Sequence, residues 1–564
     1  MDPMWTEAIQ ETDRIMDPLA MSRVSGRITE RLLTGIITLT RRARYYSFYV
    51  WAIHDVNKEK IHTYRQFRKA FYDRERAYML ASLLHQAKSS ENRDHSAILG
   101  SVKGKRKLGK SQKRIKMNFQ FLANKLGGFG YYYNSSISSL GLTDVPESRI
   151  KYILTPLGRK VAKAFERSIS KTRYFKRYIK KDEIPVSILE EYGKECCLCN
   201  LPFRKALDRD PLREIMFGLA PKLNRKRDQR RRETLLLILY ETYFASKHLH
   251  PMDVEIFLDS AYFRQFKVDK RIVKPHHPKL FDDVLKRWKM FCAHDYFSYA
   301  CESFLAAFLR TLDRHDQTGL TFQRFIDLVK KGRSIKTLEE ILHRNFGSKD
   351  LDSILVRDVI ACFGIEEFNA KASKKFDNTC KLGSRINEAL VEDKLFETFE
   401  ERFELGRAMM LAFVLLVLLY VRFYYLHKEA KKYWIWLFRI QREGGRPTDL
   451  TVTKFVPALE KKLQKEGFSV TDFLRWFMKE YVINQAKEVY WEKSLATSGK
   501  PHYWFYFEGG VYRKERDYDP KFRSSRFASA FTILNDLGLC KFNGQFTKLT
   551  SDGIKMLRRF GVSV

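Results

Sequence analysis

Apolar residues recur at helical spacing along most of this chain. Ala43, Tyr46, Val50 and Ile53 follow one another at intervals of three or four, which places them on one side of an amphipathic helix. The same spacing predicts helices over residues 234–244, 281–310 and 321–331. Only short strand-like segments accompany these helices, near the two ends of the chain. The pattern therefore predicts a mainly α-helical, multidomain protein.

One apolar run is long enough to raise the question of a membrane. Ala408 to Val421 is an unbroken stretch of 14 apolar or aromatic residues, and Arg422 ends it. A bilayer span needs about 20 such residues, whereas runs of 10–14 are more typical of buried core helices. We therefore expect the central helix of a large helical domain at this position, and no membrane partner.

Two segments far apart in the sequence share one frame. Residues 152–165 and 547–560 each contain a strand end, Leu-Thr, a glycine three residues after the threonine and a phenylalanine ten residues after it. Thr155 and Thr550 are the expected N-caps, and Pro156 stands at the first helical position, where its missing N–H costs nothing. The frame predicts the same element twice, a helix that leaves a short strand.

The second copy has a complete local context. An apolar stripe from Phe527 to Leu537 predicts a helix with Ser525 as its N-cap, and Gly538 follows where a left-handed helix end is preferred. Two strand-like segments then flank Asn543-Gly544, a strong hairpin signal, and Thr550 opens the last helix. The predicted order is helix, two-stranded hairpin, helix.

This C-terminal segment, about 522–560, resembles the winged-helix domain of MarR-like regulators. The resemblance rests on SSRFASAFTILNDLGL, KFNGQFTKLT and LTSDGIKML, and a weaker similar element covers 150–169. It implies that the helix from Arg526 is a recognition helix, with Ser529 and Thr532 outward. It also implies nucleic-acid contacts by the following residues: Arg523, Arg526, Lys541 and Lys548. Asp536 and a nearly neutral helix face depart from the family pattern. This departure favours binding to the phosphate backbone over recognition of a base sequence, and it also fits a protein-docking role.

These features divide the chain into four predicted domains. They are a helical, divergent winged-helix domain over 1–170 with a basic arm at 101–116, a central helical domain over 171–345, an apolar helical core section over 346–450 and a winged-helix domain over 451–564. Winged-helix elements are thus expected near both ends of a mainly α-helical chain.

The charge of the chain points to a polyanionic partner. Lys and Arg number 104 against 67 Asp and Glu, a net charge of +37 that exceeds what solubility requires. DNA, RNA and an anionic membrane surface all satisfy this charge, and we favour DNA over RNA. The eight cysteines form no disulfide framework and the N-terminal residues lack a signal-peptide pattern, so we expect a cytoplasmic protein.

Basic residues are densest in two stretches. Residues 101–116 contain no acidic residue and two glycines, which predicts a flexible arm able to follow a phosphate backbone. Residues 225–232 precede an apolar helix, where positive charge opposes the helix dipole and is not needed for helix stability. The predicted contacts are Lys103, Lys105, Arg106, Lys107, Lys110, Lys113, Arg114, Lys116, Arg225, Lys226, Arg227, Arg230, Arg231 and Arg232.

A third cluster leaves two interpretations open. Arg41, Arg42 and Arg44 lie beside Tyr45, Tyr46 and Tyr49, and aromatic rings next to arginines can stack on unpaired bases. Tyrosines at helical spacing are equally typical of a hydrophobic core. The sequence does not separate these two roles.

No catalytic motif or cofactor motif emerges. Cys196 and Cys199 have C-x-x-C spacing, but no second cysteine pair follows and His248 and His250 are nearly 50 residues away. We therefore predict a buried helix start there, no bound metal and no cofactor. The other candidate groups are His294 with Cys301 on one helix, and the carboxylate pairs Asp208 with Asp210 and Asp253 with Glu255.

The sequence favours a non-enzymatic subunit of a larger complex, with other protein subunits as partners. It would bind the phosphate backbone of a nucleic acid, double-stranded DNA first, with limited sequence specificity. A metal-dependent nuclease that uses the scattered carboxylates and a winged-helix protein-docking scaffold remain the alternatives.

Overall fold

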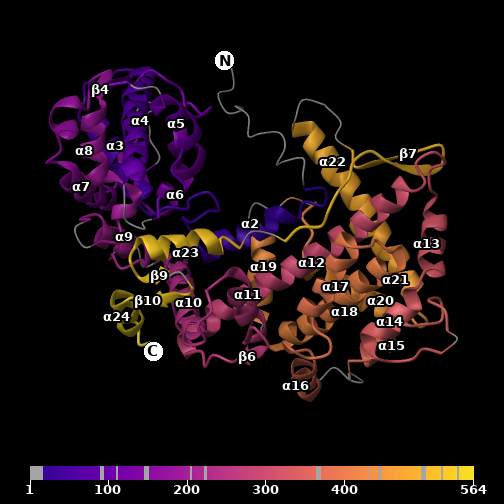
Figure 1. Ribbon diagram of the computed structural model, residues 1–564. Helices are drawn as coiled ribbons and strands as arrows, with labels where there is room; N and C mark the ends of the chain where they lie inside the picture. Colours follow the sequence, from indigo (N-terminus) through magenta and orange to yellow (C-terminus); the bar gives the residue numbers. More distant parts are fainter. Residues whose placement is uncertain are drawn as a thin grey trace. The chain divides into compact units, whose positions relative to one another are not determined.

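The computed structural model shows a mainly helical protein (Figure 1). It describes residues 17–88, 94–109, 112–144, 152–203, 206–220, 225–347, 349–363, 370–429, 431–442, 446, 448–496, 503–522, 525–542 and 545–564. The chain forms two compact units, each built from separated segments. Unit 1 contains residues 1–28, 258–274 and 285–524, and unit 2 contains residues 29–257, 275–284 and 525–564. The two units interleave along the chain, whereas each of the four predicted domains is continuous.

Unit 1 is a helical assembly with two small antiparallel hairpins in its described part. Its elements are β5 (Phe266–Val268), β6 (Arg271–Val273), α13 (Phe322–Lys331), α14 (Ser334–Leu342), α15 (Val356–Ala361), α16 (Ala370–Thr379), α17 (Glu388–Glu400), α18 (Leu405–Glu429), α19 (Lys431–Arg442), α20 (Val452–Leu463), α21 (Val470–Phe477), η6 (Met478–Asn484), α22 (Gln485–Ala496), β7 (Phe505–Glu508) and β8 (Val511–Lys514). Three helices contribute residues to both units: α2 (Met21–Leu32), α11 (Val254–Phe263) and α12 (Asp282–Asp313).

Helix α18 is the central helix of unit 1, as predicted. The side chains from Ala408 to Val421 are all buried, and α18 packs against α13, α14 and α17. By length and composition alone, Leu405–Arg422 is the one described helical segment that could cross a membrane, and 89% of it is buried inside the protein. This burial is what a core helix requires.

The arginine that ends this apolar run is itself buried. The Arg422 guanidinium forms a two-point ion pair with Glu388 at the start of α17 and also donates to the carbonyl oxygen of Cys380. Tyr262 and Phe376 contact its cationic face. Because a buried charge needs a partner and satisfied donors, these contacts explain how an arginine can occupy an apolar helix.

Unit 2 combines helices with three short antiparallel hairpins in its described part. Its elements are α3 (Arg44–Asn57), α4 (Tyr64–Lys88), α5 (Ser101–Leu108), β1 (Arg114–Lys116), η1 (Phe129–Tyr133), α6 (Asn134–Ser139), β2 (Thr143–Asp144), β3 (Ile153–Leu154), α7 (Pro156–Ile169), η2 (Tyr174–Tyr178), β4 (Glu183–Pro185), α8 (Val186–Cys196), η3 (Leu198–Asn200), α9 (Arg209–Met216), α10 (Lys226–Lys247), η5 (Lys279–Phe281), α23 (Phe527–Asp536), β9 (Cys540–Phe542), β10 (Thr547–Leu549) and α24 (Ser551–Arg559). Strand β1 pairs with β4, β2 with β3, and β9 with β10.

The core of unit 2 is built around α3 and α4. Helix α3 packs against α7, and α4 packs against α8. Gly193 permits the close contact between α4 and α8, since a Cβ at this position would lie 2.3 Å from the carbonyl oxygen of Ala81. Ala43, Tyr46, Val50 and Ile53 are buried as predicted, but every residue between Ala43 and Ile53 is buried as well, so α3 is enclosed on all sides there and lacks the single apolar face that the spacing predicts.

The repeated frame forms the same local structure twice within unit 2. The first copy is α6–β2–β3–α7 and the second is α23–β9–β10–α24. Thr155 accepts a hydrogen bond from the Gly158 amide at 3.0 Å, and Thr550 accepts one from the Gly553 amide at 3.1 Å. Both predicted N-caps are therefore confirmed.

The likeness extends to backbone contacts that the frame alone does not reveal. Thr155 and Thr550 each donate to a glycine carbonyl oxygen at 2.7 Å, that of Gly141 in the first copy and Gly538 in the second. Both glycines have positive φ, 72° and 68°, and end the preceding helix. The shared motif therefore begins one helix earlier than the sequence frame.

Candidate nucleic-acid interface

The segment predicted to be a flexible arm instead contains regular structure. Residues 101–108 form α5, and residues 114–116 form β1, which pairs with β4. Helix α5 lies against α4 because Gly104 has no side chain, and a Cβ there would lie 2.6 Å from a methyl carbon of Leu83. The basic residues of this segment are consequently fixed on a folded surface.

The outward side of α5 is cationic. Lys103, Lys105 and Arg106 are exposed, and none of them pairs with a carboxylate among the described residues. Lys107 is half-buried and its ammonium lies over the Phe119 ring. Three unpaired cations on two helical turns repel one another, and a polyanion would relieve that repulsion.

Strand β1 continues the basic surface. The side chains of Lys113, Arg114 and Lys116 are exposed, while Ile115 points into the core. Arg114 lies 3.6 Å from Glu183 across the strand pair, which neutralises part of its charge. Lys110 lies outside the described residues.

The basic run at the start of α10 is divided between surface and core. Arg225 and Lys226 are exposed, and Arg227 is half-buried. Arg225 donates to Asp228, a buried first-turn carboxylate that offsets the unfavourable charge at the helix N-terminus. Arg230 is half-buried as well.

Arg231 was predicted to contact phosphate, and this prediction is wrong for the described structure. Its guanidinium is completely buried, pairs with Asp228 at 3.0 Å and donates to the backbone carbonyl oxygens of Ile215, Met216 and Thr34. A phosphate cannot reach it without unfolding of the surrounding structure. Arg232 is half-buried with its guanidinium over the Phe560 ring.

The predicted recognition helix α23 presents its expected reading face to the interior of unit 2. Arg526 pairs with Glu30 and donates to the Ile36 carbonyl oxygen, and Ser529 donates to the Thr38 carbonyl oxygen. Ser529 is buried. Two of the three positions expected to read bases are therefore used inside the fold, and Arg523 lies outside the described residues.

The β9–β10 hairpin does carry exposed charge. Lys541 and Lys548 are directly opposite each other in the strand register, and both are exposed. Like charges at opposed positions destabilise a hairpin unless a counter-charge lies near them. Neither lysine has an acidic partner among the described residues, so this hairpin offers a second cationic patch.

Two of the three arginines beside the tyrosine cluster, Arg42 and Arg44, are structural, whereas Arg41 is exposed. Arg42 forms a two-point ion pair with Asp536, at 2.9 Å for the shortest contact, and Arg44 pairs with Asp208. Both side chains are buried, and Tyr45 and Tyr46 are completely enclosed. The core interpretation of this cluster is therefore correct, and Arg42 and Arg44 cannot contact a nucleic acid directly.

The carboxylates suggested for a nuclease do not form a metal-binding group in the described structure. Asp208 is buried against Arg44 and Ser47, and Asp210 is exposed and pairs with Arg213. Asp253 accepts a hydrogen bond from the Ile256 amide, as an N-cap does. Among the described residues, no group of three or more carboxylates has the spacing of a metal site. The structure gives the nuclease alternative no geometric support.

One group in unit 2 does bring together side chains that can ligate a metal. It consists of His85, His95, Cys197 and Cys199, whose ligand atoms all lie within 4.8 Å of one another. The pKa of the Cys197 thiol is lowered to about 7, first because it accepts a hydrogen bond from the Cys199 thiol and further because two buried arginines lie near it. Cys196, which the C-x-x-C spacing had singled out, is buried outside this group.

Sequence reasoning missed this group because its halves are far apart along the chain. The two contacting pairs, His95 with Cys197 and His85 with Cys199, are separated by 102 and 114 residues. The signal was present upstream of the cysteines, where two histidines stand ten positions apart. Only the packing of α4 on α8 shows that they meet the cysteines.

No protein-family model, curated protein or solved structure matches this chain.

Proposed function

We propose that this protein binds the phosphate backbone of a nucleic acid, double-stranded DNA in preference to RNA, through the basic surface of unit 2. The observation that carries the proposal is the outward side of α5, where Lys103, Lys105 and Arg106 are exposed without acidic partners in the described structure. No acidic residue occurs anywhere in residues 101–116, so the segment itself carries charge of a single sign.

Two further surfaces support the same function. Strand β1 adds exposed cations next to α5 in the chain, and the β9–β10 hairpin exposes Lys541 opposite Lys548. Lysines and arginines at these positions would contact phosphate oxygens, which carry no sequence information. The inward face of α23 fits this role, because the helix that would read bases is occupied by contacts within the fold.

The winged-helix assignment belongs to this proposal as well. The order α23–β9–β10–α24 is the order that a winged-helix end requires, and the α6–β2–β3–α7 copy shares its caps and turns. We infer that the protein works in the cytoplasm as one subunit of a larger complex. A docking role for the two repeated motifs is the second candidate, since contacts within the fold already use the α23 face that would read bases.

The experiment compares two variants of the full chain that lose the same charge. The first replaces Lys103, Lys105 and Arg106 with glutamine, and the control replaces three exposed lysines of unit 1, Lys461, Lys465 and Lys479, with glutamine. Affinity for a labelled DNA duplex is measured by fluorescence anisotropy at low salt. We expect the α5 variant to bind at least about tenfold more weakly than the control variant.

Equal losses in the two variants would show that only the overall charge matters, and would contradict an interface on α5. Unchanged binding in both variants would favour the docking role. A single-stranded RNA of equal length, measured beside the duplex, tests the preference for DNA.

A further inference from the structure

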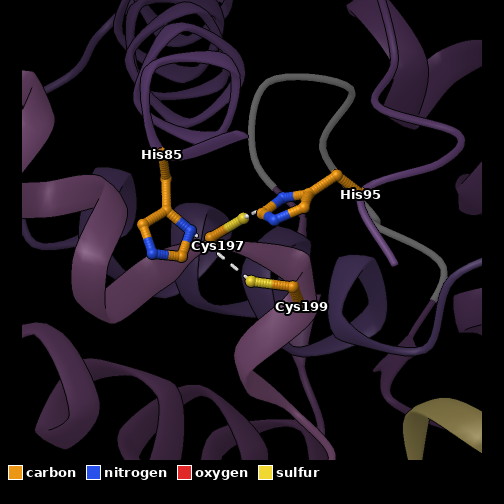
Figure 2. Close-up of side chains that lie close together, drawn as sticks. All are labelled: His85, His95, Cys197 and Cys199. Atoms are coloured by element: carbon orange, nitrogen blue, oxygen red, sulfur yellow. Dashed lines mark hydrogen bonds between the residues drawn. The ribbon is translucent and has the colours of Figure 1, made fainter. Parts of the chain in front are cut away.

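Four side chains from three separate segments of unit 2 converge on one point (Figure 2). His85 stands in the last turn of α4, His95 lies in the segment that leads into α5, and Cys197 and Cys199 flank the start of η3. His95, Cys197 and Cys199 are buried, and His85 is half-buried. Figure 2 shows the two imidazole rings and the two thiols directed toward one another.

The distances within this cluster resemble those of a tetrahedral metal site. The Nδ1 atom of His95 lies 3.5 Å from the Cys197 sulfur, and Nδ1 of His85 lies 3.4 Å from the Cys199 sulfur. In a zinc tetrahedron, bonds of about 2.3 Å to sulfur and about 2.0–2.1 Å to nitrogen place neighbouring ligand atoms about 3.6 Å apart. The widest separation, within 4.8 Å, exceeds this edge by about 1 Å, which side-chain rotation can close.

We propose that His85, His95, Cys197 and Cys199 bind a single divalent metal ion, zinc by preference, in a closed structural site. Two thiolates and two imidazoles form a donor set that zinc prefers over hard cations such as magnesium and calcium. Four protein ligands leave no open position for water or substrate, so the ion stabilises the fold and performs no chemistry.

The residues around the cluster support this assignment. The Arg44 guanidinium donates to the Cys197 carbonyl oxygen at 2.7 Å, and Arg42 donates to the carbonyl oxygens of Asp94 and Ser96, on either side of His95. Both arginines therefore hold the backbone of segments that supply ligands. Such outer contacts orient metal ligands and are a general feature of metal sites.

The packing of α4 on α8 positions the other half of the site. Gly193 faces the Ala81 carbonyl oxygen, and a Cβ there would also lie 3.2 Å from the Cβ of His85. Only glycine permits this separation, which brings the C-terminal end of α8 and the cysteines after it to the last turn of α4. The position of the site therefore depends on the close contact between α4 and α8.

A metal at this position would link three segments that no disulfide joins. The described cysteines are all free, and Ser101, the first residue of α5, lies six positions after His95. Zinc would thereby fix the base of α5 to α4 and to η3. This consequence is independent of nucleic-acid binding, because it concerns the stability of unit 2 alone.

The test is the metal content of the purified full chain, measured by inductively coupled plasma mass spectrometry after dialysis against metal-free buffer. We expect one zinc ion per chain in the wild type and in Cys196→Ala, a matched control that removes the adjacent buried cysteine outside the cluster. Cys199→Ser should lose the ion. A wild-type protein holding less than about one tenth of an equivalent when supplied with excess zinc would overturn the proposal.

Cobalt substitution keeps the proposal testable if the variant does not fold. The wild-type chain, stripped with a chelator and reloaded with Co²⁺, should show the strong visible absorption of tetrahedral cobalt and a near-ultraviolet thiolate charge-transfer band. Weak octahedral-type absorption without that band would contradict a site with two cysteine ligands. The assignment would also be refuted if Cys199→Ser and the wild type each bound one equivalent of zinc and their cobalt-loaded forms had identical absorption spectra.

Discussion

Replacing Gly553 with alanine should destabilise the second copy of the repeated motif, although alanine is the better helix former. Gly553 stands in the first turn of α24, and an added Cβ would lie 2.1 Å from the carbonyl oxygen of Leu539. Real Cβ atoms do not approach a carbonyl oxygen this closely, so the backbone must move. Two hydrogen bonds from Thr550, one from its amide and one from its hydroxyl, hold that carbonyl in place.

The sign of the effect follows from two opposed magnitudes. Exchange of glycine for alanine inside a helix stabilises by about 0.5–1 kcal/mol. Forcing an extra carbon into a well-packed contact costs about 1–3 kcal/mol, and more when the obstructing atom is backbone. We therefore expect a net loss of about 1–2 kcal/mol in the free energy of local opening. Gly158 in the first copy meets the Leu142 carbonyl oxygen at 2.0 Å and should behave in the same way.

Hydrogen exchange followed by mass spectrometry measures this effect in the intact chain. Peptides from β9, β10 and α24 should exchange faster in Gly553→Ala than in the wild type, because local opening becomes less costly. The matched control is Gly26→Ala in α2, since a Cβ there meets no atom within 4 Å. The control should leave exchange unchanged or slow it. Equal protection in Gly553→Ala and the wild type would refute the close-approach argument.

Three further substitutions test other parts of the structure. Asp536→Asn removes the charge that pairs with buried Arg42 and should lower stability by about 3 kcal/mol, measured as a reduced midpoint of thermal unfolding, and an unchanged midpoint would contradict it. Burial raises the pKa of Glu75 from 4.5 to about 7, so the stability that this group contributes is complete below pH 4.5 and is lost as the pH rises through about 7. Glu75→Gln should therefore remove up to about 3 kcal/mol of pH dependence from urea unfolding, and an equally steep profile in the variant would exclude this cause. Gly193→Ala should push α8 away from α4 and reduce cobalt uptake by the His–Cys cluster, while full uptake would show that the close helix contact is not needed.

The local elements of this protein could be predicted well because their signals are local. The capping threonine and the proline at the start of α7, and the long apolar run of α18, each lie within a few residues of the structure they specify. The charge pattern of residues 101–116 predicts a flexible arm, and that prediction is wrong for α5 and β1. Lysine and arginine are good helix formers, and the glycine in the middle of α5 serves close packing against α4.

The candidate sites could be predicted only in part, because burial and long-range pairing are not visible in a single sequence. Arg231 and Arg106 look equivalent in the chain, but one is enclosed by backbone carbonyl groups and the other is exposed. Arg42 and Arg44 belong to the same kind of basic cluster, yet each pairs with an aspartate far away in the sequence, Asp536 or Asp208. The partner of a charge therefore decides its role, and that partner is set by the fold.

The most direct test of phosphate binding by unit 2 is the salt dependence of duplex binding by the wild type and by the α5 variant that lacks Lys103, Lys105 and Arg106. Each phosphate contact adds about 0.9 to the slope of log affinity against log salt concentration. If these three residues contact phosphates, the slope of the variant should be smaller by about 2–3 than that of the wild type. Identical slopes for the two proteins, or wild-type binding that does not change with salt, would contradict the account.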